Sequence, residues 1–575
     1  MMDMGGSPAG SLTVPMLPES TAPDSHPTSV VLDWNAILRS LARGTTFGLW
    51  PFEDPDAGNT TSRFGTFLSP PMPPAAAART FALMNIAMRE ALSPLLHPGA
   101  PGALVGPGWG GATAAELLDA VSFPGAAATF AAHYVLSHLY PSRKQAMFDN
   151  AAPGWDGVLA RHLSAPGYGL TGAWANTGAV AAAQRLGVAS GRLAVQLAAA
   201  DGFDIYMPWA PNATAAAAAA APPLQLYQLT GCGTSALCIP ANDTGPLRGG
   251  DSSTSVLLPQ AGSTQPLAIA AASDWAPSLP ALDAATYAAQ LAYVARFGEA
   301  NSSWRSPSQS DAAWFWRLGA NTAGVTGLLT SVTGQLLDGA APSGRSSGAP
   351  PDLWLAADTV ARLTTAVWDA TVVATHAKYA AATWRPETAL RVGGAPWWSP
   401  HLANPAEPDA PSWHATACAA GAAVLSSVFG TNVSVTVVSE DLRDGRAGSG
   451  GLDFSQPSGA AFSAAVASGA FNELAGIGAY AGAWYRLTLP PRTYASFGAM
   501  ASECATARVL AGVSFNYSVD AGLALGSRVG SWIAATYPGN LTLRAARAGA
   551  MVDALYGVAA YSGRAGGAVP LDVSR

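Results

Sequence analysis

Apolar residues recur at helical spacing along most of this chain, and that pattern constrains the fold more than any other feature. Only 11% of its 575 residues are charged, whereas 49% are hydrophobic and many of these are alanine. Alanine favours closely packed helices because it loses no side-chain entropy in a helix. Alternating strand patterns are few, so the sequence predicts an all-α fold, a large helical bundle. The helical patterns cover 32–41, 76–95, 112–139 with a break at Pro124, 173–201, 283–297, 311–337, 353–384, a helix from about 412, 495–511 and 520–536.

Stretches rich in Pro, Gly and Ser separate these patterns and predict how the chain is organised. One such stretch, with an Ala tract and two cysteines, indicates an irregular insertion on the surface. We expect a flexible tail at 1–29, an N-terminal helical part at 30–202, the insertion with its Cys232/Cys238 loop at 203–282, a second helical bundle at 283–545 and a C-terminal segment at 546–575.

The net charge of −7 argues against two classes of partner. Without a basic excess, the chain has no electrostatic footprint for nucleic acid or for an anionic membrane surface. No membrane span is convincing either. Residues 415–438 lack charge, but Ser, Thr, Asn and Gly interrupt them, so they predict a buried helix followed by a Val-rich extended segment.

Sequons for N-linked glycosylation are frequent. Seven of the fourteen asparagines stand in Asn-x-Ser/Thr, where chance at this Ser/Thr content gives roughly two. This excess predicts a secreted, glycosylated chain, whereas the N-terminus shows no basic start followed by an apolar stretch, as a signal peptide would. The candidate sites are Asn59, Asn212, Asn242, Asn301, Asn432, Asn516 and Asn540.

Four cysteines form two plausible pairs. Cys232 and Cys238 flank five residues of a loop in which a small disulfide ring is sterically easy, and Cys418 and Cys504 lie beside the motifs described next. An even count fits disulfides, but four buried thiols are an equally good interpretation.

Two cations lie near the end of the longest helical pattern. Lys378 and Arg385 stand seven residues apart in the segment HAKYAAATWRP, residues 376–386. On a helix both point to one face, about two turns or roughly 10 Å apart. They indicate either a functional pair or a solvated pair at a helix C-terminus, where cations are favoured in any case.

Two further segments also allow a functional and a structural interpretation. In the segment PSWHAT, the Ser412 hydroxyl and the free backbone N–H groups at a helix start form a ready anion site, with His414 as a candidate acid/base group. A simple serine N-cap with an incidental histidine is the alternative.

Farther on, Glu503 and Arg508 lie near the end of one helix that is followed by a Gly-containing turn and a second helix. Taken alone, this segment is a helical hairpin with solvated charges.

The order of the three segments resembles a known superfamily. Lys-x6-Arg, then Pro-Ser-x-His, then Arg-x5-His is the signature of vanadium haloperoxidases and type-2 phosphatidic acid phosphatases. HAKY…WRP is similar to the DAKY…WRP segment of the soluble, bacterial-like haloperoxidase branch, and PSWHAT to its PSGHAT. The similarity runs from about residue 31 to 540 and implies a large helical bundle of the vanadium haloperoxidase type.

The resemblance also implies roles for single residues. By this similarity Lys378, Arg385, Arg508 and Ser412 would bind the equatorial oxygens of vanadate, because several charge-assisted hydrogen bonds offset the desolvation of an oxyanion. His414 corresponds to the acid/base histidine of the family, and Lys378 to the lysine that polarises bound peroxide. The implied activity is peroxide-dependent oxidation of halide, with vanadate as cofactor and peroxide and halide as small-molecule substrates.

Two positions depart from the family pattern. Trp413 stands where the family has the glycine whose N–H binds vanadate; its backbone N–H is kept, so Trp413 remains an expected oxyanion-binding residue. Its large side chain fills the space that glycine leaves, and would either block the anion or line a halide pocket. Ser514 stands where the family has the histidine that is vanadium's protein ligand in haloperoxidases and the nucleophile in phosphatases. A serine hydroxyl is a poor metal ligand at neutral pH, and an unactivated one is a poor nucleophile. None of the other histidines stands at a position that would replace it.

Three functions remain for such a chain. The first is a haloperoxidase-like enzyme with a degenerate site that holds vanadate without the apical ligand. The second is a non-catalytic descendant with an extracellular binding or structural role, whose pocket holds phosphate, sulfate or nothing. An acid phosphatase is the third, and Ser514 disfavours it most directly. The sequon at Asn516, two residues beyond Ser514, favours a site that has lost its activity. The halide, the organic acceptor and the oligomeric state stay open.

Overall fold

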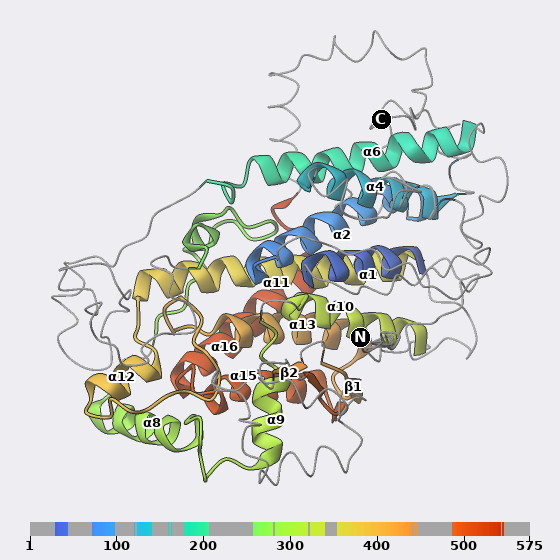
Figure 1. Cartoon of the computed structure of the whole chain (residues 1–575). Helices are drawn as coiled ribbons and strands as arrows, with labels where there is room; N and C mark the ends of the chain where they lie inside the picture. Colours follow the sequence, from blue (N-terminus) through green and yellow to red (C-terminus); the bar gives the residue numbers. More distant parts are fainter. Residues whose placement is uncertain are drawn as a thin grey trace, which may run out of the picture.

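The fold is helical, as the sequence predicts (Figure 1). The computed structural model describes residues 29–43, 72–97, 120, 123–140, 159, 163, 178–205, 257–279, 282–319, 322–339, 353–439, 442–444, 486–541 and 543–544. The α-helices in this part are α1 (Ser29–Arg43), α2 (Pro74–Leu96), α4 (Pro124–Leu139), α6 (Gly178–Ala199), α8 (Ala284–Phe297), α9 (Pro307–Phe315), α10 (Gly324–Gly339), α11 (Leu353–Ala381), α12 (Pro386–Val392), α13 (Trp413–Phe429), α15 (Phe497–Leu510) and α16 (Asn516–Thr536). The expected tail at 1–29, apart from Ser29, the Cys232/Cys238 loop and the segment at 546–575 lie outside the described residues.

The longest described helix, α11, lies between two groups of helices and packs against both. On one side α2 packs against it, and α4 and α6 continue outward from α2 (Figure 1). On its other side α13 packs against α11, and α16 and α15 pack against α13. Nearly all of α11 is therefore buried, including Trp368 and Asp369 at its middle. Its buried C-terminal end leads directly into the segment that carries the two expected cations.

Part of the expected surface insertion is in fact buried. Residues 257–279 run along α11 and include a short 3₁₀ helix, Pro259–Ser263. The carboxylate of Asp369 accepts backbone N–H bonds from Leu267 at 2.6 Å, Ala268 at 2.7 Å and Ile269 at 3.0 Å. These three residues are at most 1% exposed. The prediction of a surface position was wrong here because one buried carboxylate supplies the hydrogen bonds that an irregular segment otherwise takes from water.

Two expected helices end earlier than predicted. The pattern at 311–337 divides into α9 and α10, because Leu318 takes a φ of 41° and Gly324 a φ of 67° between them. The pattern at 353–384 ends with α11 at Ala381, and Ala382 follows with a φ of 48°. A left-handed residue of this kind stops a right-handed helix. Apolar residues at helical spacing run across both breaks, so the sequence pattern did not reveal them.

Helix α16 lies unusually close to α13. Gly522, Gly526 and Gly530 recur at every fourth position of α16, and a Cβ on any of them would collide with the backbone of α13. The added Cβ of Gly522 would lie 2.5 Å from the carbonyl oxygen of Ser412. Because these positions have no side chain, the start of α13 sits directly against α16.

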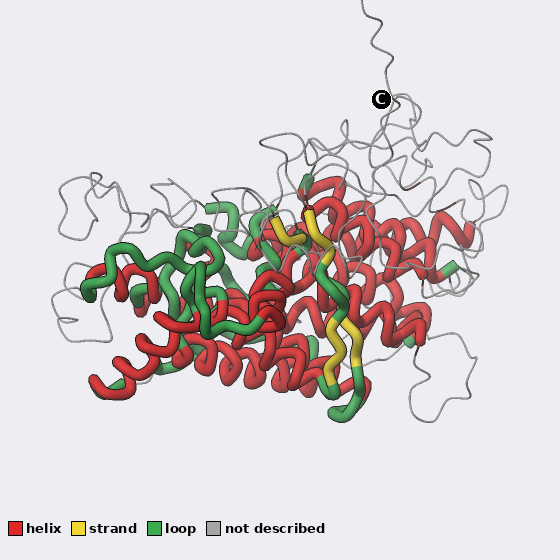
Figure 2. The backbone as a smooth tube through the Cα atoms, turned by 60° about the horizontal axis from the view of Figure 1, so that its bottom comes forward, coloured by secondary structure: helices red, strands yellow, loops and turns green. Residues whose placement is uncertain are grey.

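Two pairs of short antiparallel strands lie beside the helices (Figure 2). Strand β1 (Val435–Val437) pairs with β4 (Arg492–Tyr494), and β2 (Leu442–Asp444) pairs with β3 (Arg486–Thr488). Strand β1 confirms the expected Val-rich extended segment after α13. Within the described helices, none is both long and apolar enough to cross a membrane.

Candidate functional site

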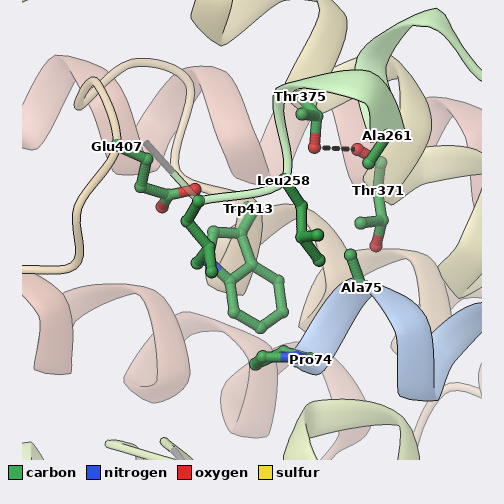
Figure 3. A pocket seen from close by; sticks show the side chains of 9 residues that line it. Pro74, Ala75, Leu258, Ala261, Thr371, Thr375, Glu407 and Trp413 are labelled. Atoms are coloured by element: carbon green, nitrogen blue, oxygen red, sulfur yellow. Dashed lines mark hydrogen bonds between the residues drawn. The ribbon is translucent and has the colours of Figure 1, made fainter. Parts of the chain in front are cut away.

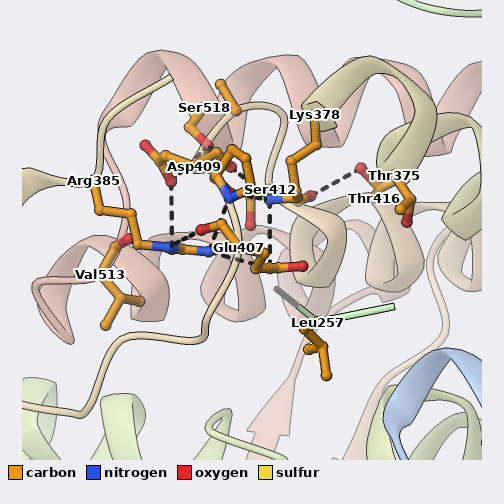
Figure 4. A network of polar contacts seen from close by, with 12 residues as sticks. Leu257, Thr375, Lys378, Arg385, Glu407, Asp409, Ser412, Thr416, Val513 and Ser518 are labelled. Atoms are coloured by element: carbon orange, nitrogen blue, oxygen red, sulfur yellow. Dashed lines mark hydrogen bonds and ion pairs between the residues drawn. The ribbon is translucent and has the colours of Figure 1, made fainter. Parts of the chain in front are cut away.

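Lys378 and Arg385 do not share a helix, so the expected 10 Å spacing along one face was wrong. Lys378 lies in the last turn of α11, whereas Arg385 is the N-cap of α12, beyond the break at Ala382. Pro386 follows Arg385, and a residue before proline is driven out of the helical region by a steric clash. The break turns the chain so that both side chains meet at one loop, residues 405–412 (Figure 4).

Lys378 is held by the backbone of that loop. Its Nζ donates to the carbonyl oxygens of Pro408 at 2.8 Å and Asp409 at 2.7 Å, and lies 3.5 Å from Oε1 of Glu407. The side chain is 1% exposed. Burial lowers the pKa of Lys378 to about 8, and nearby Arg385 also lowers it, while Glu407 and Asp409 act in the opposite direction.

Arg385 is equally engaged. Its Nε donates to the carbonyl oxygen of Glu407 at 2.7 Å, and its Nη2 to Oε1 of the same residue at 3.1 Å. Its Nη1 donates to the carbonyl oxygen of Val513 at 2.6 Å, in the turn between α15 and α16. A guanidinium has five N–H donors, and protein atoms of two separate loops already take most of them here.

Two buried carboxylates complete the cluster, and the sequence interpretation missed both. Glu407 is 5% exposed and Asp409 is 0% exposed. Asp409 accepts from the backbone N–H of Phe515 at 3.0 Å and from the Ser518 hydroxyl at 3.1 Å, and its Oδ1 lies 3.7 Å from Nη1 of Arg385. Burial raises the pKa of Asp409, and Arg385 opposes that shift. The sequence does contain a signal that could have revealed them. Two acidic residues stand just before the Pro-Ser-x-His segment, in a chain with few charges.

The segment with Ser412, Trp413 and His414 begins α13, as expected. Ser412 is the N-cap, but its hydroxyl makes no capping bond with the helix. Its backbone N–H donates to the carbonyl oxygen of Ser518 at 3.0 Å, which ties α13 to α16. The ring of Trp413 lies against that of His414, with their centroids 4.1 Å apart.

His414 is buried and electrically neutral. Its Nε2 lies 3.0 Å from the carbonyl oxygen of Arg317, which can only accept, so Nε2 carries the proton. Burial lowers the pKa of His414 well below 6.5, and the positive charge of Arg508 lowers it further. The imidazole therefore offers Nδ1 as a base and is not an additional cation at neutral pH.

Arg508 differs from the other two cations of the site. It lies in the last turn of α15 and is 6% exposed. Among the described residues, no hydrogen-bond or ion-pair partner reaches its guanidinium. Burial, followed by repulsion from Arg385, lowers the pKa of Arg508 to about 10, while the more weakly acting charges of Glu407 and Asp409 oppose the shift, so Arg508 remains charged at neutral pH. A buried charge without a counter-ion is unfavourable, and an anion bound beside it would relieve that cost.

Ser514 is buried in the turn between α15 and α16, at 2% exposure. Its hydroxyl lies beside the carboxylate of Asp409, where it favours the charged form. Two described histidines, His376 and His401, do not replace the missing nitrogen. His376 turns its Nδ1 to the carbonyl oxygen of Gly262 at 3.1 Å, and His401 lies against Trp314. Within the described residues, no three His, Cys, Asp or Glu side chains could together hold a bare metal ion.

A disulfide joins Cys418 of α13 to Cys504 of α15, which is one of the two pairs expected from the sequence. The Cα atoms of the two residues are 6.6 Å apart. The free-thiol alternative therefore does not hold for these two cysteines. The Cys232/Cys238 pair lies outside the described residues and stays a prediction.

Four of the seven sequons fall on described residues. Asn301 and Asn432 are exposed, whereas Asn540 and Asn516, the first residue of α16, are partly buried. Asn59, Asn212 and Asn242 lie outside the described residues.

Comparison with known proteins agrees with this architecture. The family model of the VCPO second helical-bundle domain matches residues 358–539, which include every residue of the cluster. No curated protein sequence matches the chain.

Three solved structures share the fold at 16% sequence identity. The chain is similar to the first bacterial vanadium-dependent iodoperoxidase, with a TM-score of 0.53 over 89% of this chain and 96% of that one. Holo-type bacterial vanadium-dependent chloroperoxidase gives 0.52 over 86% and 96%, and the apo-type gives 0.51 over 83% and 96%. Residues 358–539 thus match the VCPO second helical-bundle domain, and the chain shares the fold of these vanadium-dependent haloperoxidases.

Proposed function

We propose that this chain is an oxyanion-binding protein on the haloperoxidase fold, and that it has lost the metal chemistry of that fold. The observation that carries the proposal is Arg508, a buried and charged guanidinium without a partner among the described residues. Lys378 and Arg385 surround the same region with further positive charge. The ligand class is a small tetrahedral oxyanion such as phosphate or vanadate.

The start of α13 supplies neutral donors for such a ligand. Ser412 leaves its hydroxyl free of the helix cap, and the first N–H groups of α13 have no partner inside the helix. A helix N-terminus also carries a partial positive charge that favours anions. Together with Arg508, these donors could offset the desolvation of one oxyanion through charge-assisted hydrogen bonds.

The residues present fit vanadate as an oxyanion but not as a coordinated metal. Bound in this fold, vanadate would supply a Lewis acid to peroxide. Its protein ligand would have to come from position 514, where the Ser514 hydroxyl instead lies beside Asp409. A serine oxygen does not replace imidazole nitrogen as a ligand at neutral pH. We therefore assign no step of halide oxidation to the residues of this pocket.

A second candidate function is weak peroxide-dependent halide oxidation. The observation that favours it is His414, whose unprotonated Nδ1 and closeness to Arg508 suit a base next to a bound oxyanion. An acid phosphatase has less support, because the chain has no histidine nucleophile at position 514.

The test of the main proposal is ligand-dependent stability. Thermal unfolding of the wild type and of Arg508→Met is measured with and without inorganic phosphate, at mildly acidic pH where the monoanion dominates. A ligand that binds only the native state stabilises it by about 2.7 kcal/mol at one hundred times its Kd. We expect phosphate to raise the unfolding temperature of the wild type and not that of Arg508→Met. Equal shifts in the two proteins, or no shift in the wild type, would contradict the proposal.

A halide-oxidation assay separates the two candidate functions. Vanadate, peroxide and bromide are supplied to the wild type and to Ser514→His. We expect no oxidation of bromide by the wild type, and turnover there would establish the second candidate. Turnover only in Ser514→His would show that the remaining groups are intact and that position 514 alone removed the activity.

The exposed sequons at Asn301 and Asn432 favour a secreted, glycosylated chain within this proposal. Loss of mass on treatment with an N-glycosidase, for chain produced in a secretory host, is the corresponding test.

A further inference from the structure

Glu407 occupies the position at which two of the three cations converge. Its Oε1 lies 3.5 Å from Nζ of Lys378 and 3.1 Å from Nη2 of Arg385 (Figure 4). Its own carbonyl oxygen accepts from Nε of Arg385 at 2.7 Å. The carboxylate is therefore an internal anion, attached to the chain and held where an external oxyanion would meet both cations.

The charges of the cluster nearly cancel. Lys378, Arg385 and Arg508 contribute three positive charges, and Glu407 and Asp409 contribute two negative ones. All five side chains are almost fully buried. In such an environment water screens charge poorly, so each added unit of charge strongly affects binding. One net positive charge remains, and it lies on the side of Arg508.

The side chain of Trp413 lies near that of Glu407 (Figure 3). Both residues line a cavity of about 20 Å³, together with Leu258 and Thr375 (Figure 3). A cavity of this size has room for about one water molecule, so little free space remains between the two side chains. The indole of Trp413 therefore takes up space beside Glu407 that the glycine of the family would leave open.

Building on the proposed function, we propose that Glu407 selects ligands by charge. It acts as a built-in counter-anion, so the pocket accepts singly charged oxyanions and rejects doubly charged ones. A dianion would leave the cluster with a net negative charge in a buried site, whereas a monoanion would bring it to neutrality. Trp413 is the positioning residue, because it closes the space into which Glu407 would otherwise turn.

Two tetrahedral anions of fixed charge test this selection. Perrhenate carries one negative charge and sulfate carries two at any pH suited to the protein. Their dissociation constants are measured by calorimetry on the wild type, Glu407→Gln and Glu407→Asp. We expect the wild type to bind perrhenate about tenfold or more tightly than sulfate, and Glu407→Gln to shift the ratio towards sulfate by at least about tenfold. Glu407→Asp keeps the charge and should keep the preference.

Two further variants separate local charge from other causes. Trp413→Gly should shift the ratio in the same direction as Glu407→Gln, because the carboxylate gains room to leave the cations. Asp201→Asn is the matched control, since Asp201, just beyond the end of α6, is a buried carboxylate paired at 2.8 Å with Arg79 of α2. Cooperative thermal unfolding shows that each variant is folded.

The results distinguish this inference from the function on which it rests. If both anions bind but Glu407→Gln has the wild-type ratio, or Asp201→Asn shifts the ratio equally, Glu407 is not the selector, while oxyanion binding stands. If neither anion binds to the wild type or to any variant, both proposals fail.

Discussion

Cys418 is bonded to Cys504, and each of the two cysteines lies four residues from a residue of the pocket, His414 on α13 and Arg508 on α15. Four residues along an α-helix correspond to about one turn and return to the same face. The disulfide therefore lies one turn behind the pocket on both helices. It sets the spacing between the helix start that offers neutral donors and the helix end that carries the unpartnered cation.

Removing this disulfide should lower both stability and anion binding. The bond closes a loop with a sequence separation of 86 residues, and a bond of this kind contributes about 2–4 kcal/mol to the free energy of unfolding. We expect Cys418→Ala/Cys504→Ala to unfold at a lower temperature and to show a smaller shift with phosphate than the wild type. A variant that loses stability but keeps the full phosphate shift would show that the bond does not position the pocket.

Replacing Arg508 should cost little in the absence of ligand. Methionine has a similar length without the charge, so Arg508→Met removes a buried cation that has no partner among the described residues. We expect its free energy of unfolding in urea to equal or exceed that of the wild type.

Arg89 is the matched control for that substitution. Its Nε donates to Asp358 at 2.7 Å, its Nη1 lies 2.5 Å from Glu90, and it is 2% exposed. Arg89→Met breaks two buried ion pairs, although Asp358 keeps Arg362 at 2.7 Å, and should cost about 3–5 kcal/mol. If Arg508→Met were as destabilising as Arg89→Met, Arg508 would have a structural partner in the native chain.

Asp369 should make stability depend on pH in a defined window. Burial raises the pKa of Asp369 to about 6, although three backbone N–H groups oppose the shift. The folded chain binds the proton of the Asp369 carboxyl group more tightly than the unfolded chain does. The stabilisation of the folded chain by this proton is therefore full below about pH 4 and is lost as the pH rises through 6. The difference from the ordinary aspartate pKa of 3.8 corresponds to about 3 kcal/mol.

The measurement compares urea unfolding of the wild type and Asp369→Asn between mildly acidic and neutral pH. The free energy of unfolding of the wild type should fall more steeply with rising pH than that of Asp369→Asn. Parallel pH profiles for the two proteins would show that Asp369 keeps an ordinary pKa in the folded chain.

Much of the architecture was accessible from local patterns. Apolar spacing correctly predicted α13, α15 and α16, because helix formation on one buried face depends on residues three and four apart. The start of α13 at Ser412 was likewise predicted, since a serine before an apolar run is a local signal. The breaks at Leu318 and Ala382 were missed, because nothing in the side chains there marks a left-handed backbone.

By itself, then, the sequence determined the helical class, the family resemblance and which residues could meet in one pocket, since motif order and spacing are properties of the chain. Only the tertiary structure decided what those residues contact. Lys378 and Arg385 converge on Glu407 because the chain breaks after α11 and the loop at 405–412 folds back over it. The same loop also leaves Arg508 without a partner among the described residues. Its two acids, Glu407 and Asp409, face Arg385 instead. Pairings of this kind depend on distances between segments far apart in sequence, which no local pattern encodes.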